Sequence, residues 1–362
     1  MNVIELVESF KKKFNPSGTR EGSRAVNREI GLAVSKLVES KKLDPNQVSF
    51  RHLYESLVGR HEEHLEEGNI VSSAFPTIAG SLISSKMIEG YTMWPDETGR
   101  LVEVVPSKLK TSNIVGWTNV TGVERVNERQ DYPQLKPPSE KAKTINNYKY
   151  GGLLDLTKEA IFFDQTGELL RQAKQVGEAA RRKRMRLIWD AVVDANATAY
   201  SGADLYASGN GNVQTSNPLG GASSWETVRA KLMAQTDENG DPIWVFGDRP
   251  IMIVPSGLLA TAEKLQKNPT GDLGTANLDV NLAQGQFDII VNPYLSASST
   301  TWWYGAPNRQ FRWEDVWPFE VYTRVGQDTE EGFKADVIQQ FKASFFGGVG
   351  AVDTKFVIQN EA

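Results

Sequence analysis

GELLRQAKQVGEAARRKRMRLIWDAVVDANATA, residues 167–199, is the stretch of the sequence that decides the fold. Its apolar residues keep the three-to-four spacing of one helix face, with an interruption at Arg184. They are Leu169, Ala173, Val176, Ala180, Leu187, Ala191 and Ala195. Asp164 or Thr166 can cap the start. Such a helix would span ~50 Å, whereas about 11 residues is typical of globular proteins. The pattern therefore predicts a rod-like helix lying across a sheet.

Basic residues are concentrated within this predicted helix, namely Arg181, Arg182, Lys183, Arg184 and Arg186. On a helix they spread around most of the circumference. One interpretation is contact with nucleic acid or with acidic neighbours. The other is a solvated face stabilised by pairs such as Glu178–Arg182. The net charge of −5 argues against a protein whose main task is to grip nucleic acid.

Upstream of this helix, the sequence predicts an arm that projects from the body. Residues 113–123 look extended, and strand-like sequence returns at 148–156. Between them, residues 124–147 contain few apolar side chains, so this segment cannot bury a core of its own. Prolines mark its tip, at Pro133, Pro137 and Pro138. A lone hairpin is marginal in water, so a two-stranded arm normally lies on something else. The alternative interpretation is a disordered surface loop.

The remaining sequence predicts helices before the arm and an α/β region after the long helix. Residues 1–70 and 72–91 have helical patterns, and residues 201–223 form a loop rich in Gly, Asn and Ser. The α/β region begins with a helix at 225–233, a strand at 250–255 and a helix at 256–265. A long polar loop at 268–285 follows. The last strands are predicted at 287–291, 300–305, 319–325, 335–345 and 355–360.

The usual signatures of catalysis do not come together in this sequence. Cysteine is absent, which excludes disulfides and thiolate chemistry. His52, His61 and His64 all lie in the N-terminal helical region, and no GxSxG motif offers a nucleophile for them. His61 and His64 could bind a metal with Glu67, but their Glu-rich surroundings favour a solvated face. We therefore expect no catalytic residue, no cofactor and no metal site.

Two glycine clusters and one acidic turn imitate ligand-binding motifs. Gly209-Asn210-Gly211 and Gly347-Gly348-Val349-Gly350 complete no phosphate-binding motif, and we predict that both are turns. Asp237, Asn239 and Asp241 imitate three ligands of a calcium loop, but Gly240 is misplaced and the pattern predicts a hairpin. No apolar stretch approaches the ~18 residues of a membrane span, and no signal peptide is visible. The expected protein is a soluble cytoplasmic chain without a membrane partner.

The order of these parts resembles the HK97-type capsid fold, and the sequence is similar to the Mu-like prophage major head subunit family. The resemblance covers about 72–362 and rests on short stretches in matching order. They are Ser73-Ala74-Phe75-Pro76 with Leu82, Ile83 and Tyr91; residues 156–161; Ile253-Val254-Pro255 with Leu258 and Ala262; residues 289–295 with Trp302-Trp303-Tyr304; and residues 350–353. Phe163 and Gln165 depart from the polar and acidic residues usual there, and residues 1–70 have no assignable counterpart.

The resemblance implies an α+β, HK97-like architecture with a defined division of the chain. An N-terminal helical arm would occupy 1–71, followed by the lead-in to the P domain at 72–112 and an extended E-loop hairpin at 113–150. The P domain would occupy 151–222 with its spine helix at 167–199, the α/β A domain 223–320, and returning P-domain strands 321–362. The implied inter-subunit residues of the E-loop are Glu124, Arg125, Arg129, Asp131, Tyr132, Lys136, Glu140 and Lys141. Those of a loop near the capsomer axis are Asn268, Thr270, Asp272, Asn277 and Asp279.

The function implied by the resemblance is that of a major capsid protein of a tailed bacteriophage, and not of an enzyme. Its partners would be copies of itself in pentamers and hexamers, and packaged double-stranded DNA bound without sequence specificity. Scaffold, portal, head protease and decoration proteins are further implied partners, with assembly in the host cytoplasm. Three alternatives remain: an encapsulin-like compartment shell, a hydrolase using His61, and a DNA-binding protein using residues 181–186.

Overall fold

The computed structural model describes residues 74–116, 125–132, 142–163, 168–195, 199–200, 204–237, 240–243, 249–268, 281–326 and 330–361. Its strands form three sheets, with orders β1-β9-β10-β4, β5-β11-β8-β6-β7 and β2-β3. The chain divides into two compact units. Unit 1 takes its described residues from 74–95, 149–183 and 317–345, and unit 2 from 96–148, 184–316 and 346–361. The predicted α+β class is confirmed.

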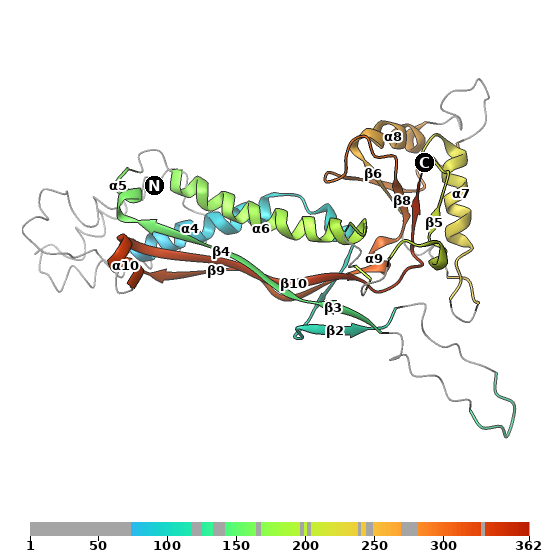
Figure 1. Ribbon diagram of the computed structural model, residues 1–362, viewed down its shortest axis with the longest axis horizontal. Coiled ribbons are helices and arrows are strands. Elements are labelled where there is room, and N and C mark those ends of the chain that lie inside the picture. Colours follow the sequence, from blue (N-terminus) through green and yellow to red (C-terminus); the bar gives the residue numbers. More distant parts are fainter. Residues whose placement is uncertain are drawn as a thin grey trace, which may run out of the picture. The chain divides into compact units, whose positions relative to one another are not determined.

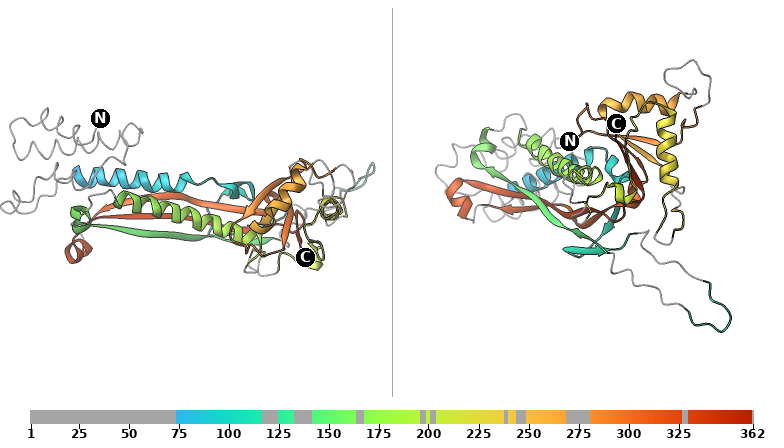
Figure 2. Two further views of the ribbon diagram at one scale, coloured as in Figure 1. Left: turned by 90° about the horizontal axis from the view of Figure 1, so that it is seen from above. Right: turned by 45° about the vertical axis from the view of Figure 1, so that its right-hand side comes forward.

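Unit 1 consists of helices packed along strands. Helix α4 (Ala74–Met93) and the first part of α6 (Glu168–Val192) lie along β4 (Tyr148–Thr157), β9 (Phe311–Val325) and β10 (Val337–Ala351) (Figures 1 and 2). The unit also contains the short helices α5 (Lys158–Phe163) and α10 (Glu330–Ala335). Its buried side chains include Leu82, Met87, Leu170, Ala173 and Phe341. On α4, Leu82 and Met87 belong to the face that the helical spacing predicts. On α6, Ala173 belongs to the predicted face, whereas Leu170 is buried in place of the predicted Leu169, which is half-buried.

The backbones of α4 and α6 approach each other directly. A Cβ atom on Gly177 would lie 1.9 Å from the carbonyl oxygen of Met87, and one on Gly90 would lie 2.1 Å from the carbonyl oxygen of Lys174. Glycine therefore permits a crossing that a side chain at either position would push apart. The same two helices are joined at the surface by Lys174, whose Nζ lies 3.3 Å from Glu89 Oε1.

The predicted helix 167–199 is too long at its C-terminal end. Helix α6 ends at Val192, and Asp194 takes a left-handed conformation with φ of 53°. Its carboxylate accepts hydrogen bonds from the backbone N–H groups of Leu205, at 2.9 Å, and Ala199, at 3.4 Å. This side chain thus stabilises a chain reversal in place of another helical turn. Ala195 consequently lies beyond the helix, not on its apolar face.

Unit 2 contains a mixed sheet covered by helices. Its strands are β5 (Val213–Gln214), β11 (Val357–Asn360), β8 (Trp302–Gly305), β6 (Ile251–Pro255) and β7 (Asp288–Asn292). Strand β6 is parallel to β7 and antiparallel to β8. Helices α7 (Ala222–Met233) and α8 (Leu259–Lys267) flank the sheet (Figure 1). Trp225, Phe287, Trp302 and Tyr304 lie in the core beneath them.

The smaller elements of unit 2 are short helical turns and one edge strand. They are η3 (Glu97–Arg100), β1 (Glu103–Pro106), η6 (Ser208–Asn210), η7 (Ser256–Leu258) and α9 (Pro307–Gln310). The turn predicted at Gly209–Gly211 is confirmed, since Gly211 has φ of 70°. The hairpin predicted around Gly240 is also confirmed, because Thr236 and Pro242 form an antiparallel bridge. Asn239 lies outside the described residues.

The second glycine cluster is not a turn, and this prediction is wrong. Gly347, Gly348 and Gly350 lie inside strand β10. A Cβ atom on Gly347 would lie 2.7 Å from the Trp313 ring, and one on Gly348 would lie 2.3 Å from the carbonyl oxygen of Asn146. These glycines therefore allow close approach of neighbouring chain segments and are not needed for turn geometry.

Among the described helices, none is long and apolar enough to cross a membrane.

Candidate functional site

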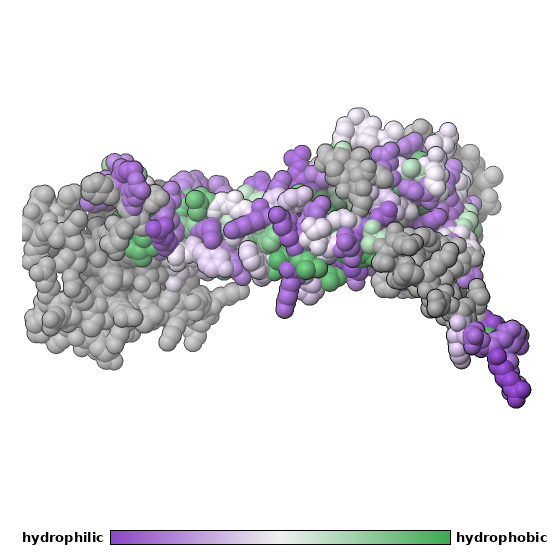
Figure 3. Space-filling model, turned by 60° about the horizontal axis from the view of Figure 1, so that its bottom comes forward, coloured by the Kyte–Doolittle hydropathy of each residue, from purple (hydrophilic) through white to green (hydrophobic). Residues whose placement is uncertain are grey.

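The predicted arm begins as a two-stranded hairpin. Strand β2 (Thr111–Ile114) pairs antiparallel with β3 (Lys143–Asn146), with Thr111 opposite Asn146. Residues 125–132, at the lower right of Figure 3, are mostly hydrophilic. They contain a reverse turn in which the Gln130 N–H donates to the Asn127 carbonyl oxygen at 3.1 Å. A hairpin is therefore present within the predicted arm, but its returning strand is β3 and not the predicted strand at 148–156, which is β4 of the sheet β1-β9-β10-β4.

Part of the predicted inter-subunit set lies on this arm segment. Arg125, Arg129, Asp131 and Tyr132 are described, and Arg129 has φ of 68° in the reverse turn. The Tyr132 side chain is 85% exposed. Glu124, Lys136, Glu140, Lys141 and the three prolines predicted to mark the tip lie outside the described residues. An aromatic side chain so exposed on a hydrophilic segment is typical of an interface anchor.

The root of the arm is fastened by a buried carboxylate that the sequence analysis did not identify. Glu314 of β9 is 4% exposed. Its Oε2 accepts hydrogen bonds from Ser112 Oγ of β2 and from Asn147 Nδ2, which directly follows β3, both at 2.7 Å. Asn147 Nδ2 also donates to the carbonyl oxygen of Leu109 at 2.9 Å. One carboxylate oxygen therefore holds both strands of the arm where they leave the body.

The first members of the basic cluster on α6 contact aromatic rings of unit 1. The Arg181 guanidinium lies 5.1 Å from the centre of the Tyr91 ring, and Lys183 Nζ lies 5.6 Å from that of Tyr150. Both contacts belong to unit 1. Contacts of this kind contribute about 0.5–1 kcal/mol at exposed sites.

The other end of the basic cluster belongs to unit 2. Arg184 lies 5.0 Å from the Trp313 ring, and Arg186 lies 5.7 Å from the Tyr294 ring. Arg186 Nε is also 3.8 Å from Asp190 Oδ2. Arg182 is exposed. The cluster thus stacks largely on rings of its own chain, a role that neither sequence interpretation included.

Charge near the cluster also affects one acidic group. Burial raises the pKa of Asp315 above its ordinary 3.8, and the positive charge of Arg184 partly offsets that rise. Arg184 therefore packs against Trp313 and also moderates the cost of keeping Asp315 ionised.

The predicted loop at 268–285 is described only at its two ends. Asn268 follows α8, and its carbonyl oxygen accepts a hydrogen bond from Asn281 Nδ2 at 2.7 Å. Asn281 Nδ2 also donates to the carbonyl oxygen of Leu265 at 2.6 Å. This asparagine closes the two ends of the loop against each other. Thr270, Asp272, Asn277 and Asp279 lie outside the described residues.

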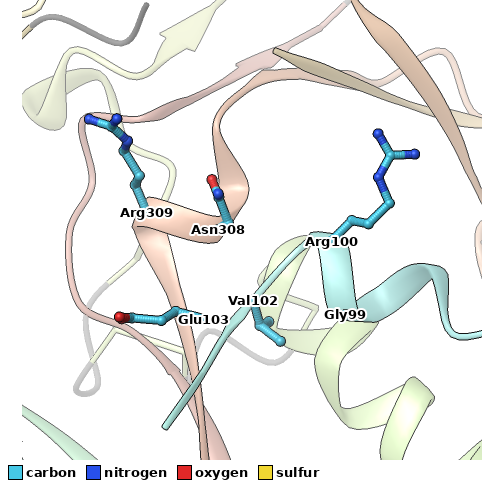
Figure 4. A pocket seen from close by; sticks show the side chains of 6 residues that line it. All are labelled: Gly99, Arg100, Val102, Glu103, Asn308 and Arg309. Carbon is cyan, nitrogen blue, oxygen red and sulfur yellow. The ribbon is translucent and has the colours of Figure 1, made fainter. Parts of the chain in front are cut away.

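A polar hollow of about 310 Å³ in unit 2 offers little for catalysis. It is lined by Gly99, Arg100, Val102, Glu103, Asn308 and Arg309. The Arg100 and Arg309 guanidinium groups lie at opposite sides of it and do not converge (Figure 4). Glu103 accepts two hydrogen bonds from Arg312, at 3.0 and 2.8 Å. Its charge is thus already neutralised by a structural ion pair.

Metal binding finds no support in the part of the chain that the structure describes. No group of three or more His, Asp or Glu side chains there is placed to hold an ion. His52, His61, His64 and Glu67 lie outside that part, so the alternative built on them stays a prediction.

Comparison with known proteins gives one match by sequence family. Residues 141–360 match the family described as phage capsid protein. The matched residues make up more than half of the chain. The match includes β3, β4, α6, the mixed sheet of unit 2 and the returning strands. No curated protein sequence matches the chain.

Several solved structures share low similarity with the chain. The capsid of a native GTA particle is 12% identical, with 74% of this chain and 91% of that chain covered and a TM-score of 0.49. A virus-like particle from Pyrococcus furiosus is 9% identical, with 77% and 97% covered and a TM-score of 0.45. A chain from Mycobacterium phage Cain is 14% identical, with 74% and 91% covered and a TM-score of 0.42. Since every TM-score here is below 0.5, the assignment of a family rests on the sequence match.

Proposed function

This chain belongs to the phage capsid protein family, and on that premise we propose that it is the major head subunit of a tailed bacteriophage. The observation that carries the proposal is the family match over residues 141–360. The proposed role is assembly of an icosahedral shell around double-stranded DNA, with no catalytic turnover. Within the family, the stretches quoted above favour the Mu-like prophage head subunits.

The proposed mechanism is repeated contact between copies of the chain. Closed shells form when one surface patch meets a complementary patch on the next copy, and many weak contacts act together. The arm suits this role because its described segment has little apolar surface of its own, whereas Tyr132 is almost fully exposed. We propose that the arm lies on a neighbouring copy within pentamers and hexamers, with Tyr132 as its anchor.

Contact with DNA would be weak and independent of sequence. The net charge is −5, and four of the five basic residues in the α6 cluster stack on aromatic rings of the same chain. Arg182 and the exposed side of Arg186 are the members best placed for phosphate contact. The capsomer-axis role of residues 268–285 and the scaffold, portal, head protease and decoration partners belong to the same proposal.

The experiment that tests the proposal shortens the arm while keeping its root. Residues 117–141 are replaced by a short Gly-Asn turn, which retains β2, β3 and the Asn147 contacts. We expect a folded chain that no longer forms shells, whereas the parent chain forms hollow particles, rings or tubes under the electron microscope. Normal shells from the shortened chain would refute the role of the arm.

A finer variant separates the anchor from the arm. Tyr132→Ala should leave the melting temperature unchanged, because the side chain is exposed, and should raise the concentration needed for assembly. The matched control is Tyr294→Ala, at a tyrosine that is 42% exposed on the body. Equal assembly of parent and Tyr132→Ala chains would remove Tyr132 from the interface.

The encapsulin-like compartment remains the alternative within the same architecture. The family match favours a phage shell over a cellular one. The contents of particles purified from the native source decide between them. Nuclease-protected double-stranded DNA supports the phage shell, and protein cargo without DNA supports the compartment.

A further inference from the structure

We infer that Glu314 is a positioning residue that fixes the direction in which the arm leaves the body, and that the arm root is a releasable joint. The residues concerned all belong to unit 2. The inference rests on the proposed function only in treating the arm as an assembly element. The geometry of the root stands without it.

The first observation is that a single carboxylate oxygen accepts hydrogen bonds from both sides of the arm root. Ser112 lies on the outgoing strand of the arm and Asn147 follows the returning strand. Both donate to the same atom, Glu314 Oε2, at 2.7 Å. Hydrogen bonds to an ionised carboxylate are roughly twice as strong as neutral ones. Losing this one carboxylate would therefore loosen both strands together.

The second observation is that packing alone does not call for a carboxylate here. Ser112, Asn147 and Glu314 are all buried, with 6%, 1% and 4% exposure. A buried carboxylate is costly unless it is hydrogen-bonded, and an apolar side chain would fill the same space at less cost. The hydrogen bonds of Glu314 go to the arm. The role of the Glu314 carboxylate is thus to hold the arm root by these hydrogen bonds.

The third observation is that one buried polar atom at the arm root lacks a hydrogen bond. Asn147 Oδ1 is buried and has no hydrogen-bond partner. The amide cannot be reversed without loss, because Nδ2 faces two acceptors, Glu314 Oε2 and the Leu109 carbonyl oxygen. A Cβ atom on Gly348 would lie 2.6 Å from Asn147 Oδ1, so the glycine leaves room for this orphaned oxygen. Buried unsatisfied groups lower local stability, which is what a joint that opens requires.

Further contacts restrain the arm besides the hydrogen bonds to Glu314. Lys143 Nζ of β3 lies 4.0 Å from the centre of the Tyr200 ring. This contact holds the returning strand alone, whereas Glu314 holds both strands. The outgoing strand also keeps a long contact between Ser112 Oγ and Ser107 Oγ at 3.5 Å, and Ile145 of the returning strand is buried beside Gly350. Release of Glu314 would therefore loosen the arm root without detaching either strand.

The test measures the direction of the arm in the full chain. Because the sequence has no cysteine, Thr144→Cys on β3 and Glu226→Cys on α7 introduce the only thiols. Both positions are exposed and belong to unit 2. Spin labels at the two sites report the distance between arm and body by double electron–electron resonance. Labelled chains are diluted into excess unlabelled chains, so that distances between subunits do not contribute.

Glu314→Gln should increase the displaced population of the arm roughly tenfold, since a charge-assisted acceptor is replaced by a neutral one. Ser112→Ala should give a smaller increase. The matched control is Glu103→Gln, which removes a carboxylate from the neighbouring strand β1, where it pairs with Arg312. It should leave the distance distribution unchanged.

The inference is overturned if Glu314→Gln and Ser112→Ala both fold and both keep the parent distribution. If Glu314→Gln does not fold, Ser112→Ala alone decides. A broadening by Glu103→Gln equal to that by Glu314→Gln would also overturn it, because the effect would then be general. Failure of the parent chain to form shells would refute the proposed function, yet the distance measurement would still test the joint.

Discussion

Replacing Gly177 by alanine tests whether the close crossing of α4 and α6 limits the stability of unit 1. Helix propensity alone predicts that Gly177→Ala stabilises the chain by about 1 kcal/mol. The structure predicts the opposite, because the new Cβ would lie 1.9 Å from the Met87 carbonyl oxygen and 2.9 Å from the Tyr91 nitrogen. Ordinary contact begins at 3.4 Å, so the helices would have to separate. The sign of the change therefore distinguishes the two effects.

The magnitude follows from the cost of overpacking. Forcing a methyl group into a filled core costs about 1–3 kcal/mol, and the obstacle here is backbone, which cannot rotate away as a flexible side chain can. At the upper end of that range, subtracting the gain in propensity leaves a net loss of about 2 kcal/mol. For a domain of about 150–250 residues, this loss corresponds to a fall in melting temperature of about 4–8 °C.

Thermal unfolding followed by far-UV circular dichroism measures the shift, and hydrogen exchange locates it. Amides of α4 and α6 should lose protection, whereas those of α7 and α8 in unit 2 should keep it. The control is Gly152→Ala on β4, where a Cβ atom would meet no heavy atom within 4 Å. A Gly177→Ala chain that melts at or above the parent temperature would refute the reasoning from the crossing.

The remaining predictions concern buried charge. Arg184→Ala should destabilise the chain by about 1 kcal/mol through loss of the contact with Trp313. It should also raise the pKa of Asp315 further, because it removes the charge that offsets burial. Since the pKa of Asp315 is raised on folding, its contribution to stability falls as pH rises above 3.8, and the variant should lose more at neutral pH than in acid. Burial likewise raises the pKa of Asp194, so Asp194→Asn should gain stability relative to the parent as pH rises through and above 3.8. Asparagine also tolerates the left-handed conformation at this position.

Chemical unfolding at acidic and neutral pH checks both variants, and NMR titration of the Asp315 carboxyl group checks the pKa. Arg182→Ala, at an exposed position of the same cluster, serves as the control and should change stability by less than about 0.5 kcal/mol. A pH-independent difference between Asp194→Asn and the parent would contradict the assignment of an unfavourable buried charge.

Much of the fold could be predicted from the sequence because local periodicity and local burial agree. The predicted strand at 250–255 corresponds to β6, the strand-like stretch at 148–156 to β4, and the helical pattern at 167–199 to α6. The errors occurred where a distant contact decides the local structure. The C-terminal end of α6 depends on hydrogen bonds from Leu205 and Ala199, which no window of the helix reveals.

The candidate site was harder to predict for the same physical reason. Strand β9 begins at Phe311, whereas the predicted strand began at residue 319. The prediction started too late because the charge of Glu314 interrupts an otherwise strand-like pattern. That charge is buried only because Ser112 and Asn147 reach it from positions far away in the sequence. The local signal that could have drawn attention to Glu314 is a pair of acidic residues between Trp313 and Trp317, and it does not distinguish Glu314 from Asp315.

The close contacts of two adjacent glycines of β10, Gly347 and Gly348, predict different phenotypes for mutations at the two positions. A side chain at Gly347 would strike both the Glu314 carbonyl oxygen and the Trp313 ring inside unit 2, so a mutant chain should fail to fold and should be degraded. A side chain at Gly348 would instead press on Asn146 and Asn147 at the arm root. That mutant chain should survive and enter mixed particles with a misdirected arm. In a cell carrying both alleles, changes at Gly347 should therefore be recessive, and changes at the adjacent Gly348 should be dominant.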